Sequence, residues 1–473
     1  MLLIGREKEQ QLLRKANDSF KPEFIVIYGR RRIGKTYLVD ATFQGQFAFR
    51  ISALPPLQKG KSAQSPLRRQ LDHFYYTLLM HGMKRCKKPK SWAEAFYLLE
   101  AFLSEKNNER LVVFLDELPW FDTPKSDFIT NFIGFWNNWA CSRNITLIVS
   151  GSSIAWMTKN IFDDVGGLYG RPTLRMKLSA FSLKETELFF QRKGVNLSRY
   201  DIAQAQIFLG GVPYYLDQFQ PGLSFAQNMD GIFFSENAPL QGEFNDLFPA
   251  SFLRPSEVKN IVLALGGKRE GLSRGDILKL LKKQDGGTFT DDLLALERAD
   301  FICSFRRLGE KQTRYRLIDP FSKFAMLFQN EIPLKDPHYF SANLNSGTIN
   351  ALKGYGFENL CFNHLHQIKA ALGISGVACE TYSFSASNPA SQIDMVIVRK
   401  DNIINLCEMK FTVDPYSLSK AEDQSLQTKI KAISSLSPLS SAIHPVLVTT
   451  YDPGDSLYRN SFERIITLDD LFS

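Results

Sequence analysis

The residues with the clearest chemistry lie near the N-terminus. A complete GxxxxGK[ST] pattern occupies residues 29–36, after the apolar run at 24–28 and before a helical pattern. Its glycines let backbone amides face phosphate groups, and the N-terminus of the following helix adds partial positive charge. Lys35 is predicted to reach the β- and γ-phosphates of a nucleotide, and Thr36 to ligate Mg²⁺. The predicted nucleotide-binding residues are Gly29, Arg30, Arg31, Arg32, Ile33, Gly34, Lys35, Thr36 and Tyr37.

Two carboxylates end a second apolar run, at 110–117. Asp116 is predicted to hold the hydrated Mg²⁺, and Glu117 to polarise the attacking water as catalytic base. Ser150 ends a third apolar run, either as a sensor of the γ-phosphate or as an ordinary strand end. Arg171, in a Gly-Arg-Pro turn, either neutralises the γ-phosphate, in its own subunit or a neighbour's, or forms a surface ion pair. The candidate catalytic residues of this site are therefore Lys35, Glu117 and Arg171.

A second group of ionisable residues lies near the C-terminus. Along 403–411 the side chains alternate, so Glu408 and Lys410 point the same way. Asp394, on the neighbouring strand, can project from the same end of the sheet, and Glu358 lies beside the apolar stripe of a helix predicted at 354–374. Carboxylate oxygens suit Mg²⁺, which activates water, while a lysine can orient that water. The exposed face of an ordinary hairpin is the alternative, but both strand carboxylates follow mostly apolar residues, where an unpaired buried charge is expensive.

Several kinds of element must position these two groups. Helical patterns fill 181–250, and three helical segments followed by a hairpin fill 255–318. The second arrangement suits a winged helix, whose wing could meet a DNA backbone. Its phosphate contacts would be Arg306, Arg307, Lys311, Arg314 and Arg316. The third helical segment carries Asp291, Asp292, Glu297 and Asp300, which oppose phosphate, so an intramolecular packing role is favoured over DNA binding.

Composition narrows the class of protein. A chain of 473 residues exceeds one ordinary core, and 44% hydrophobic with 22% charged residues is typical of a globular protein. The net charge of +8 permits contact with DNA without establishing it. Six scattered cysteines with no CxxC pair argue against disulfides and structural zinc. The N-terminus does not resemble a signal peptide, and no apolar run approaches the roughly 20 residues that span a bilayer. A cytoplasmic protein is expected.

Six short motifs together resemble the archaeal-type ATPases of the AAA+/STAND group. They are IGREKEQQLL (4–13), YGRRRIGKT, LDELPW, IVSGSS, LYGRPT and GGVPYYL (210–216), and the similarity runs over essentially the whole chain. The resemblance implies ATP and Mg²⁺ as cofactors, with Gly5 and Arg6 near the adenine. It also implies that Pro213 belongs to a small helical lid, that a winged helix follows, and that the chain ends in a restriction-endonuclease-like domain.

The C-terminal residues resemble the PD-(D/E)XK nuclease pattern. This resemblance implies that Asp394 and Glu408 are metal ligands, Lys410 the catalytic base or positioning group, and Glu358 an accessory ligand. The proline that usually precedes the aspartate is replaced here by Ile393. A helix at 423–436 places Gln427 and Lys429 as possible phosphate contacts, although an ordinary surface lysine is the default interpretation of Lys429.

The predicted fold class is a multidomain α/β protein. It comprises a P-loop ATPase core (1–180), a helical lid (181–250), a winged helix-turn-helix (251–330), a linker (331–350) and a nuclease-like α/β domain (351–473). The predicted function is an ATP-hydrolysing ATPase coupled to a metal-dependent DNA nuclease, in defence or mobile-DNA processing. The alternative is a nucleotide-dependent DNA- or protein-binding regulator with an inert nuclease-like domain. DNA is the expected partner; a homo-oligomer is compatible, and the sequence names no protein partner.

Overall fold

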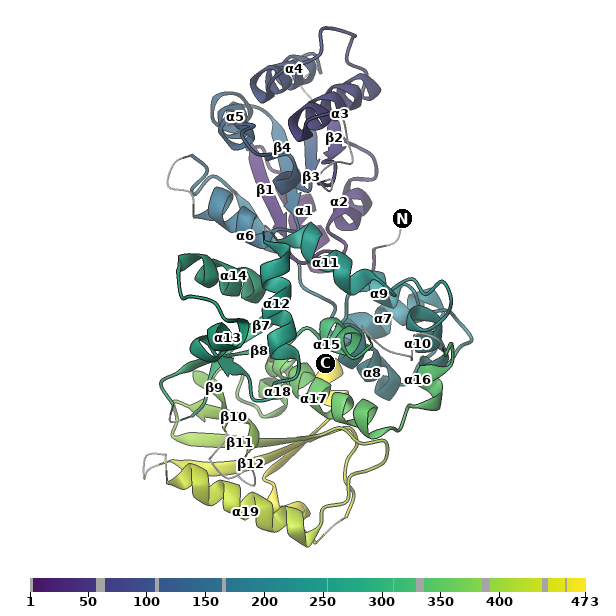
Figure 1. Cartoon of the computed structure of the whole chain (residues 1–473), viewed down its shortest axis with the longest axis vertical. Coiled ribbons are helices and arrows are strands. Elements are labelled where there is room, and N and C mark those ends of the chain that lie inside the picture. Colours follow the sequence, from purple (N-terminus) through teal and green to yellow (C-terminus); the bar gives the residue numbers. More distant parts are fainter. Residues whose placement is uncertain are drawn as a thin grey trace. The chain divides into compact units, whose positions relative to one another are not determined.

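The computed structural model describes residues 3–56, 64–106, 110–163, 167–252, 254–308, 310–328, 336–384, 392–435, 441–455 and 457–473 (Figure 1). The chain divides into two compact units. The first comprises residues 1–179, 245–256 and 290–299, and the second comprises residues 180–244, 257–289 and 300–473. Among the residues that the structure describes, none of the helices combines the length and apolar character needed to cross a membrane.

A five-stranded parallel sheet forms the centre of the first unit. Its strands lie in the order β2-β3-β4-β1-β5. They are β1 (Glu23–Tyr28), β2 (Phe49–Ser52), β3 (Leu111–Asp116), β4 (Ile145–Gly151) and β5 (Leu174–Lys177). Because all five strands run the same way, the segments that follow β1, β3 and β4 meet at one edge of the sheet, as they must to build a joint site.

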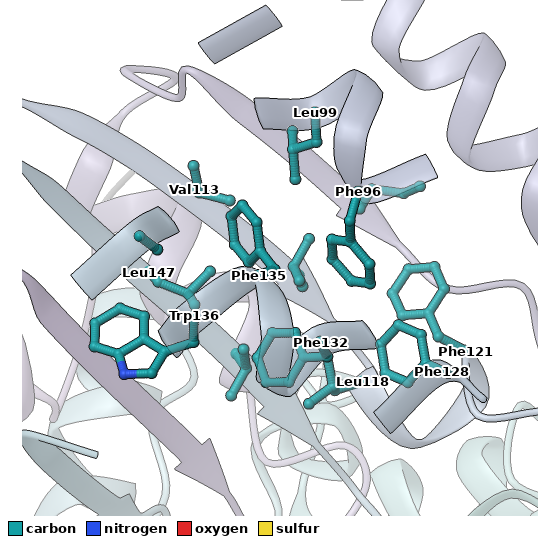
Figure 2. Close-up of a cluster of buried hydrophobic side chains, with 14 of the residues drawn as sticks. Phe96, Leu99, Val113, Leu118, Phe121, Phe128, Phe132, Phe135, Trp136 and Leu147 are labelled. Atoms are coloured by element: carbon teal, nitrogen blue, oxygen red, sulfur yellow. The ribbon is translucent and has the colours of Figure 1, made fainter. Parts of the chain in front are cut away.

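Both faces of this sheet are covered, which explains why its strands read as continuous apolar runs. Phe24 and Val26 of β1 enter an aromatic-rich core, whereas Ile25 and Ile27 enter a second core on the opposite face. Figure 2 shows part of the aromatic core, in which Phe96, Leu99, Phe128, Phe132, Phe135 and Trp136 surround Val113 and Leu147 of the sheet. The helices and turns of this unit are α1 (Glu7–Asn17), α2 (Lys35–Phe43), α3 (Pro66–Met80), α4 (Trp92–Ser104), η1 (Leu118–Trp120), α5 (Phe128–Gly134), η2 (Phe135–Trp139), η3 (Ala140–Ser142), α6 (Ile154–Met157) and η4 (Thr158–Phe162).

A group of helices opens the second unit. It contains α7 (Leu183–Lys193), α8 (Arg199–Leu209), α9 (Pro213–Leu216), α10 (Phe225–Phe233), α15 (Pro320–Met326) and α16 (Tyr339–Ala342). Ser182 and Ser224 start α7 and α10 with capping boxes, so the sequence marks those helix starts. Phe208 of α8 lies at their centre, where its ring meets Phe324 of α15 and Phe340 of α16. The last helix of the predicted winged-helix segment, α15, and a helix of the predicted linker, α16, therefore share one core with the predicted lid.

Residues 255–318, where the three helical segments and the hairpin of a winged helix were predicted, contain three helices and a small antiparallel sheet. These are α12 (Pro255–Gly266), β6 (Leu272–Ser273), α13 (Arg274–Leu281), α14 (Gly287–Arg298), β7 (Ile302–Arg306) and β8 (Thr313–Leu317), with strand order β6-β8-β7. Residues 290–299, which include most of α14, group with the first unit together with α11 (Glu243–Ser251). Within that unit Asp292 is buried and ion-paired to Arg254 at 2.9 Å. This acidic residue thus takes part in an ion pair inside the first unit.

The C-terminal part holds a five-stranded mixed sheet in the order β13-β12-β11-β10-β9. Its strands are β9 (Cys379–Phe384), β10 (Ile393–Arg399), β11 (Ile403–Lys410), β12 (Ala442–Thr449) and β13 (Arg464–Thr467). The helices are α17 (Gly347–Asn363), α18 (Leu365–Ala371), α19 (Lys420–Ser434), and the short turns η7 (Arg459–Ser461) and η8 (Leu468–Phe472). Ile404 and Leu406 of β11 pack with Leu426 and Ile433 of α19, so the even-numbered residues of β11 face α19.

The segment predicted as a linker is more ordered than its Pro, Asn and Ser content indicated. Residues 331–335 lie outside the described part of the chain, but α16 and the start of α17 fall within 336–350. Asp230 of α10 holds the start of α16 by accepting a hydrogen bond from the Phe340 amide at 2.7 Å, and the Phe340 ring is fully buried. Phe340 thus anchors a largely polar segment to the helical core.

Candidate functional site

The predicted phosphate-binding loop follows β1 and leads directly into α2. Gly29 has φ +150°, and a Cβ there would lie 2.3 Å from the carbonyl oxygen of Leu178. Gly34 has φ +85° and forms the N-cap of α2, and Arg32 also has a positive φ of 72°. Glycine is thus required at residue 29 by lack of space and at residue 34 by backbone conformation.

Lys35 lies inside this loop with its ammonium group fully engaged. Its Nζ donates to the carbonyl oxygens of Gly29 (3.0 Å) and Arg30 (3.1 Å) and to the hydroxyl of Ser152 (2.9 Å). Burial lowers the pKa of Lys35, although the carboxylates of Glu117 and Asp116 oppose that shift. The lysine amine is therefore held by three acceptors at the sheet edge from which phosphate would approach.

Asp116 gathers three hydroxyl groups at the tip of β3. Its Oδ2 accepts hydrogen bonds from Thr36 (3.0 Å) and Ser52 (2.8 Å), and its Oδ1 accepts one from Ser150. The aspartate is only 4% exposed. The predicted pair of magnesium residues, Thr36 and Asp116, is thus brought into direct contact, and oxygen donors of this kind fit a hard divalent cation.

Glu117 is held by Ser152, which sequence reasoning missed. The Ser152 amide donates to Glu117 Oε2 at 2.9 Å, and the Ser152 hydroxyl donates to Oε1. The same hydroxyl accepts from Lys35, so one buried serine connects the predicted base to the loop lysine. Ser150, the predicted sensor, instead contacts Asp116 and the Glu117 amide. The run of small polar residues at the end of β4 is the sequence feature that could have pointed to Ser152.

The remaining predicted nucleotide residues lie at different distances from the loop. Arg6 is buried, and its guanidinium donates to the Ser179 carbonyl, one residue beyond the Leu178 that contacts Gly29. Arg171, in contrast, precedes β5, whose neighbour Thr173 bonds Phe24 at the start of β1. Arg171 therefore lies at the sheet edge opposite the phosphate-binding loop, and the structure does not bring it to the nucleotide site of its own chain.

The C-terminal carboxylates meet on two neighbouring strands. The register pairs Met395 with Cys407, which places Asp394 opposite Glu408, and the Met409 amide donates to Asp394 Oδ2 at 3.0 Å. The ladder from β10 to β9 shifts its register between Ile393 and Val396, next to the aspartate. Such a bulge re-aims a side chain relative to simple alternation.

Glu408 is buried and only half satisfied. It is 7% exposed, and its Oε2 accepts a hydrogen bond from Lys429 of α19 at 2.6 Å. Its Oε1 is buried with no hydrogen-bond partner within the described part of the chain. A small cavity of about 50 Å³ adjoins it, lined by polar groups that include Lys410, Tyr416 and Ser425. Lys429 is thus a partly buried partner of Glu408 rather than a fully exposed surface lysine.

Electrostatics mark Glu408 and Glu358 as unusual acids. Burial raises the pKa of Glu408 to about 7, and the nearby charge of Asp394 adds to this, while Lys429 opposes it. Burial likewise raises the pKa of Glu358 to about 7, again with Asp394 adding and Arg269 opposing. Both side chains respond to the same aspartate, which indicates that the three carboxylates share one neighbourhood.

Two of the three C-terminal carboxylates are placed to hold a metal ion, and the third is occupied by an arginine. The described residues contain no group of three or more His, Cys, Asp or Glu side chains arranged to hold a metal. Asp394 and Glu408 provide two carboxylates, and the unpartnered Oε1 of Glu408 provides a free oxygen. Glu358, predicted as an accessory ligand, is instead ion-paired with Arg269. A hard cation held by two carboxylates fits this donor set.

Comparison with known proteins agrees with the N-terminal site. Residues 3–219 match a family of ATPase domains found predominantly in Archaea. An uncharacterised protein of Methanocaldococcus jannaschii, MJECL04, is 26% identical over 382 residues, which span 78% of each chain. Two solved structures are similar: the Walker-type ATPase PABY2304 of Pyrococcus abyssi (17% identity, TM-score 0.48, 69% of this chain and 96% of that one) and the ORC2 protein of Aeropyrum pernix in ADPNP–ADP complexes (15%, 0.40, 73% and 96%). Residues 3–219 thus resemble ATPase domains of archaeal type.

Proposed function

We propose that this protein couples ATP hydrolysis in its N-terminal domain to Mg²⁺-dependent cleavage of DNA at the Asp394–Glu408 site. The observation that carries the nuclease half is the buried, unpartnered Oε1 of Glu408, opposite Asp394 on the adjacent strand. An unsatisfied buried carboxylate oxygen is costly, and its retention is explained if the oxygen serves a cation.

In the ATPase half, Thr36 and Asp116 would hold Mg²⁺, which neutralises phosphate charge when bound. Lys35 would exchange its carbonyl contacts for the β- and γ-phosphates. Glu117, oriented by both donors of Ser152, would accept a proton from the attacking water. Arg171 would act on the nucleotide of a neighbouring subunit, since it lies at the end of its own sheet opposite the phosphate-binding loop.

In the nuclease half, Asp394 and Glu408 would hold Mg²⁺, which when bound supplies an activated water and neutralises charge on the phosphate. Lys410 lies on the same face of β11 as Glu408 and lines the same cavity, so it would position the water. Lys429 neutralises Glu408 from the opposite element. Release of Lys429 toward a DNA phosphate would leave the glutamate to the metal.

Packing within the second unit supports the coupling. Helix α8, in the segment predicted as the lid, packs directly on α17, the helix that carries Glu358. Gly356 permits this approach, since a Cβ there would lie 2.5 Å from Ile207 of α8. A shift of the lid with nucleotide state would therefore move α17 and alter the carboxylate site.

The test incubates purified protein with plasmid, Mg²⁺ or Mn²⁺, and ATP. The wild type is expected to cleave, whereas Asp394→Asn and Lys410→Ala should not. Asp401→Asn serves as a matched control, because Asp401 lies on the same hairpin but is exposed and paired with Arg399. Plasmid that stays intact under every nucleotide and metal condition would refute the nuclease.

The ATPase half has its own test. Lys35→Ala should abolish ATP hydrolysis, because no other group supplies the ammonium charge inside the loop. Hydrolysis at the wild-type rate in this variant would remove Lys35 from the mechanism. If ATP drives cleavage, the same variant should also lose ATP stimulation of plasmid nicking.

A regulator with an inert nuclease-like domain is the second candidate. It is favoured by the two ion pairs that occupy the glutamates, Lys429 on Glu408 and Arg269 on Glu358. For this candidate the plasmid stays intact while DNA or protein binding depends on ATP. A gel-shift titration with and without nucleotide separates the two functions.

A further inference from the structure

The turn between α12 and β6 presents one arginine to the carboxylate site. Arg269 lies in this turn, and its Nη2 is ion-paired with Glu358 Oε1, 89 residues further along the chain. Glu358 is almost fully buried, whereas the Arg269 side chain is 56% exposed. The pair therefore joins an exposed, movable cation to a buried acid that no sequence signal connects to it.

The turn itself is built rather than loose. Backbone hydrogen bonds from Lys268 to Leu265 and from Gly271 to Lys268, both 3.0 Å, close it. Gly271 has φ +66°, and a Cβ there would lie 2.7 Å from the Tyr315 carbonyl, so the turn is tightly seated on β8. Residues 268–271 thus form a defined platform for Arg269.

Two arginines predicted to contact DNA phosphates hold this platform instead. Arg307 donates to Glu270 Oε2 at 2.8 Å, and Arg314 donates to the carbonyl oxygens of Glu270 (3.3 Å) and Gly271 (3.1 Å). The segment just after β7, which carries Arg307, is also tied to the C-terminal sheet, because the Leu308 amide donates to the Ser383 carbonyl at 3.1 Å. The wing is therefore docked on the edge strand β9 and carries the turn with it.

We propose that Arg269 is a latch: by pairing with Glu358 it withholds that carboxylate from a divalent cation and keeps the Asp394–Glu408 site in a low-affinity state. The inference rests on the proposed metal site. A cation bound there would be repelled by the guanidinium, so cation binding and the Arg269–Glu358 pair oppose each other. Movement of the turn, carried by the wing, would release Glu358.

The test measures Mn²⁺ affinity directly, by electron paramagnetic resonance of free Mn²⁺ at pH 8 without nucleotide. Wild type and Arg269→Gln are compared on the full chain. Loss of the arginine charge should lower the dissociation constant of the Mn²⁺ that binds through Asp394 about tenfold, after allowance for solvent screening of a half-exposed arginine. Arg269→Lys should stay close to wild type because it keeps the charge.

Two variants make the outcome specific. Asp394→Asn identifies the Mn²⁺ bound at this site, and Arg306→Gln removes an exposed positive charge from the neighbouring strand β7 without touching Glu358. Asp394-dependent binding that is unchanged or weaker in Arg269→Gln overturns the latch and leaves the metal site standing. If neither the wild type nor the arginine variants show Mn²⁺ binding that depends on Asp394, both the metal site and the latch are overturned. If Arg306→Gln raises Mn²⁺ affinity as much as Arg269→Gln does, the latch is also overturned. The effect would then come from the loss of any nearby positive charge and not from the pair with Glu358.

Discussion

The contact between α8 and α17 can be tested with two glycines on one helix. Gly356 and Gly354 both lie inside α17, but a Cβ at Gly356 would lie 2.5 Å from Ile207, whereas one at Gly354 meets nothing within 4 Å. Replacing either glycine by alanine should favour the helix by roughly 0.5–1 kcal/mol. At Gly356 that gain is opposed by overpacking, which costs roughly 1–3 kcal/mol.

The two variants should therefore move in opposite directions. Gly354→Ala is expected to be slightly more stable than the wild type, and Gly356→Ala less stable, with a difference of roughly 1–3 kcal/mol between them. Thermal unfolding followed by calorimetry and by circular dichroism reports the shift. Equal stability of the two variants would show that α8 does not pack closely on α17. If the contact transmits nucleotide state, Gly356→Ala should also weaken the effect of ATP on plasmid cleavage while ATP hydrolysis persists.

Three further outcomes follow from single side chains. Ser152→Ala should lower the rate of ATP hydrolysis about 10–100-fold with little change in ATP affinity, because it loses charged hydrogen bonds that include the one to Lys35. Ser153→Ala is the control. Equal hydrolysis rates in the two variants would contradict a role of Ser152 in orienting Glu117 and Lys35. Stability should fall as pH rises from about 5 to 8, because a carboxyl whose folded pKa is about 7 rather than 4.5 binds its proton more tightly when folded. Glu408→Gln should flatten that fall by on the order of 2–3 kcal/mol in urea titrations, and an unchanged slope would exclude Glu408 as the cause. Gly29→Ala should weaken binding of a fluorescent ATP analogue at least about tenfold, since the added Cβ would collide with a carbonyl 2.3 Å away; wild-type affinity would contradict this.

The residues that meet in the candidate nucleotide site could largely be grouped from the sequence, because most of them lie close together along the chain. Residues 29–36 are contiguous, and the carboxylates at 116 and 117 needed only one further assumption, that parallel strands end at the same edge. Arg171 shows where this reasoning stops. Its distance from the loop depends on which end of β5 it occupies, and motif order along the chain does not reveal strand direction and register. Ser152 was missed because two serines flank Gly151 and only the structure decides which one bonds Lys35.

The C-terminal site was predictable on one strand but not across elements. Alternation correctly placed Glu408 and Lys410 on one face of β11, and the cavity beside them contains both. Arg269 was invisible, because its partner lies 89 residues away and its turn is shaped by contacts with two other arginines. From the sequence, a surface position was the default interpretation of Lys429, whereas the packing of α19 on β11 places it partly buried against Glu408.

The shared core around Phe208 bears on how such a chain can be divided. The family match ends at residue 219, yet Phe208 is covered by rings from α15 and α16, more than 100 residues later. A fragment that stops at the family boundary would present this aromatic surface to water and aggregate. Recombination that exchanged the C-terminal part between relatives would meet the same constraint, since the incoming segment must also complete the core around Phe208. Packing therefore requires the N-terminal part that matches the ATPase family and the C-terminal part to be inherited together, even if each carries its own chemistry.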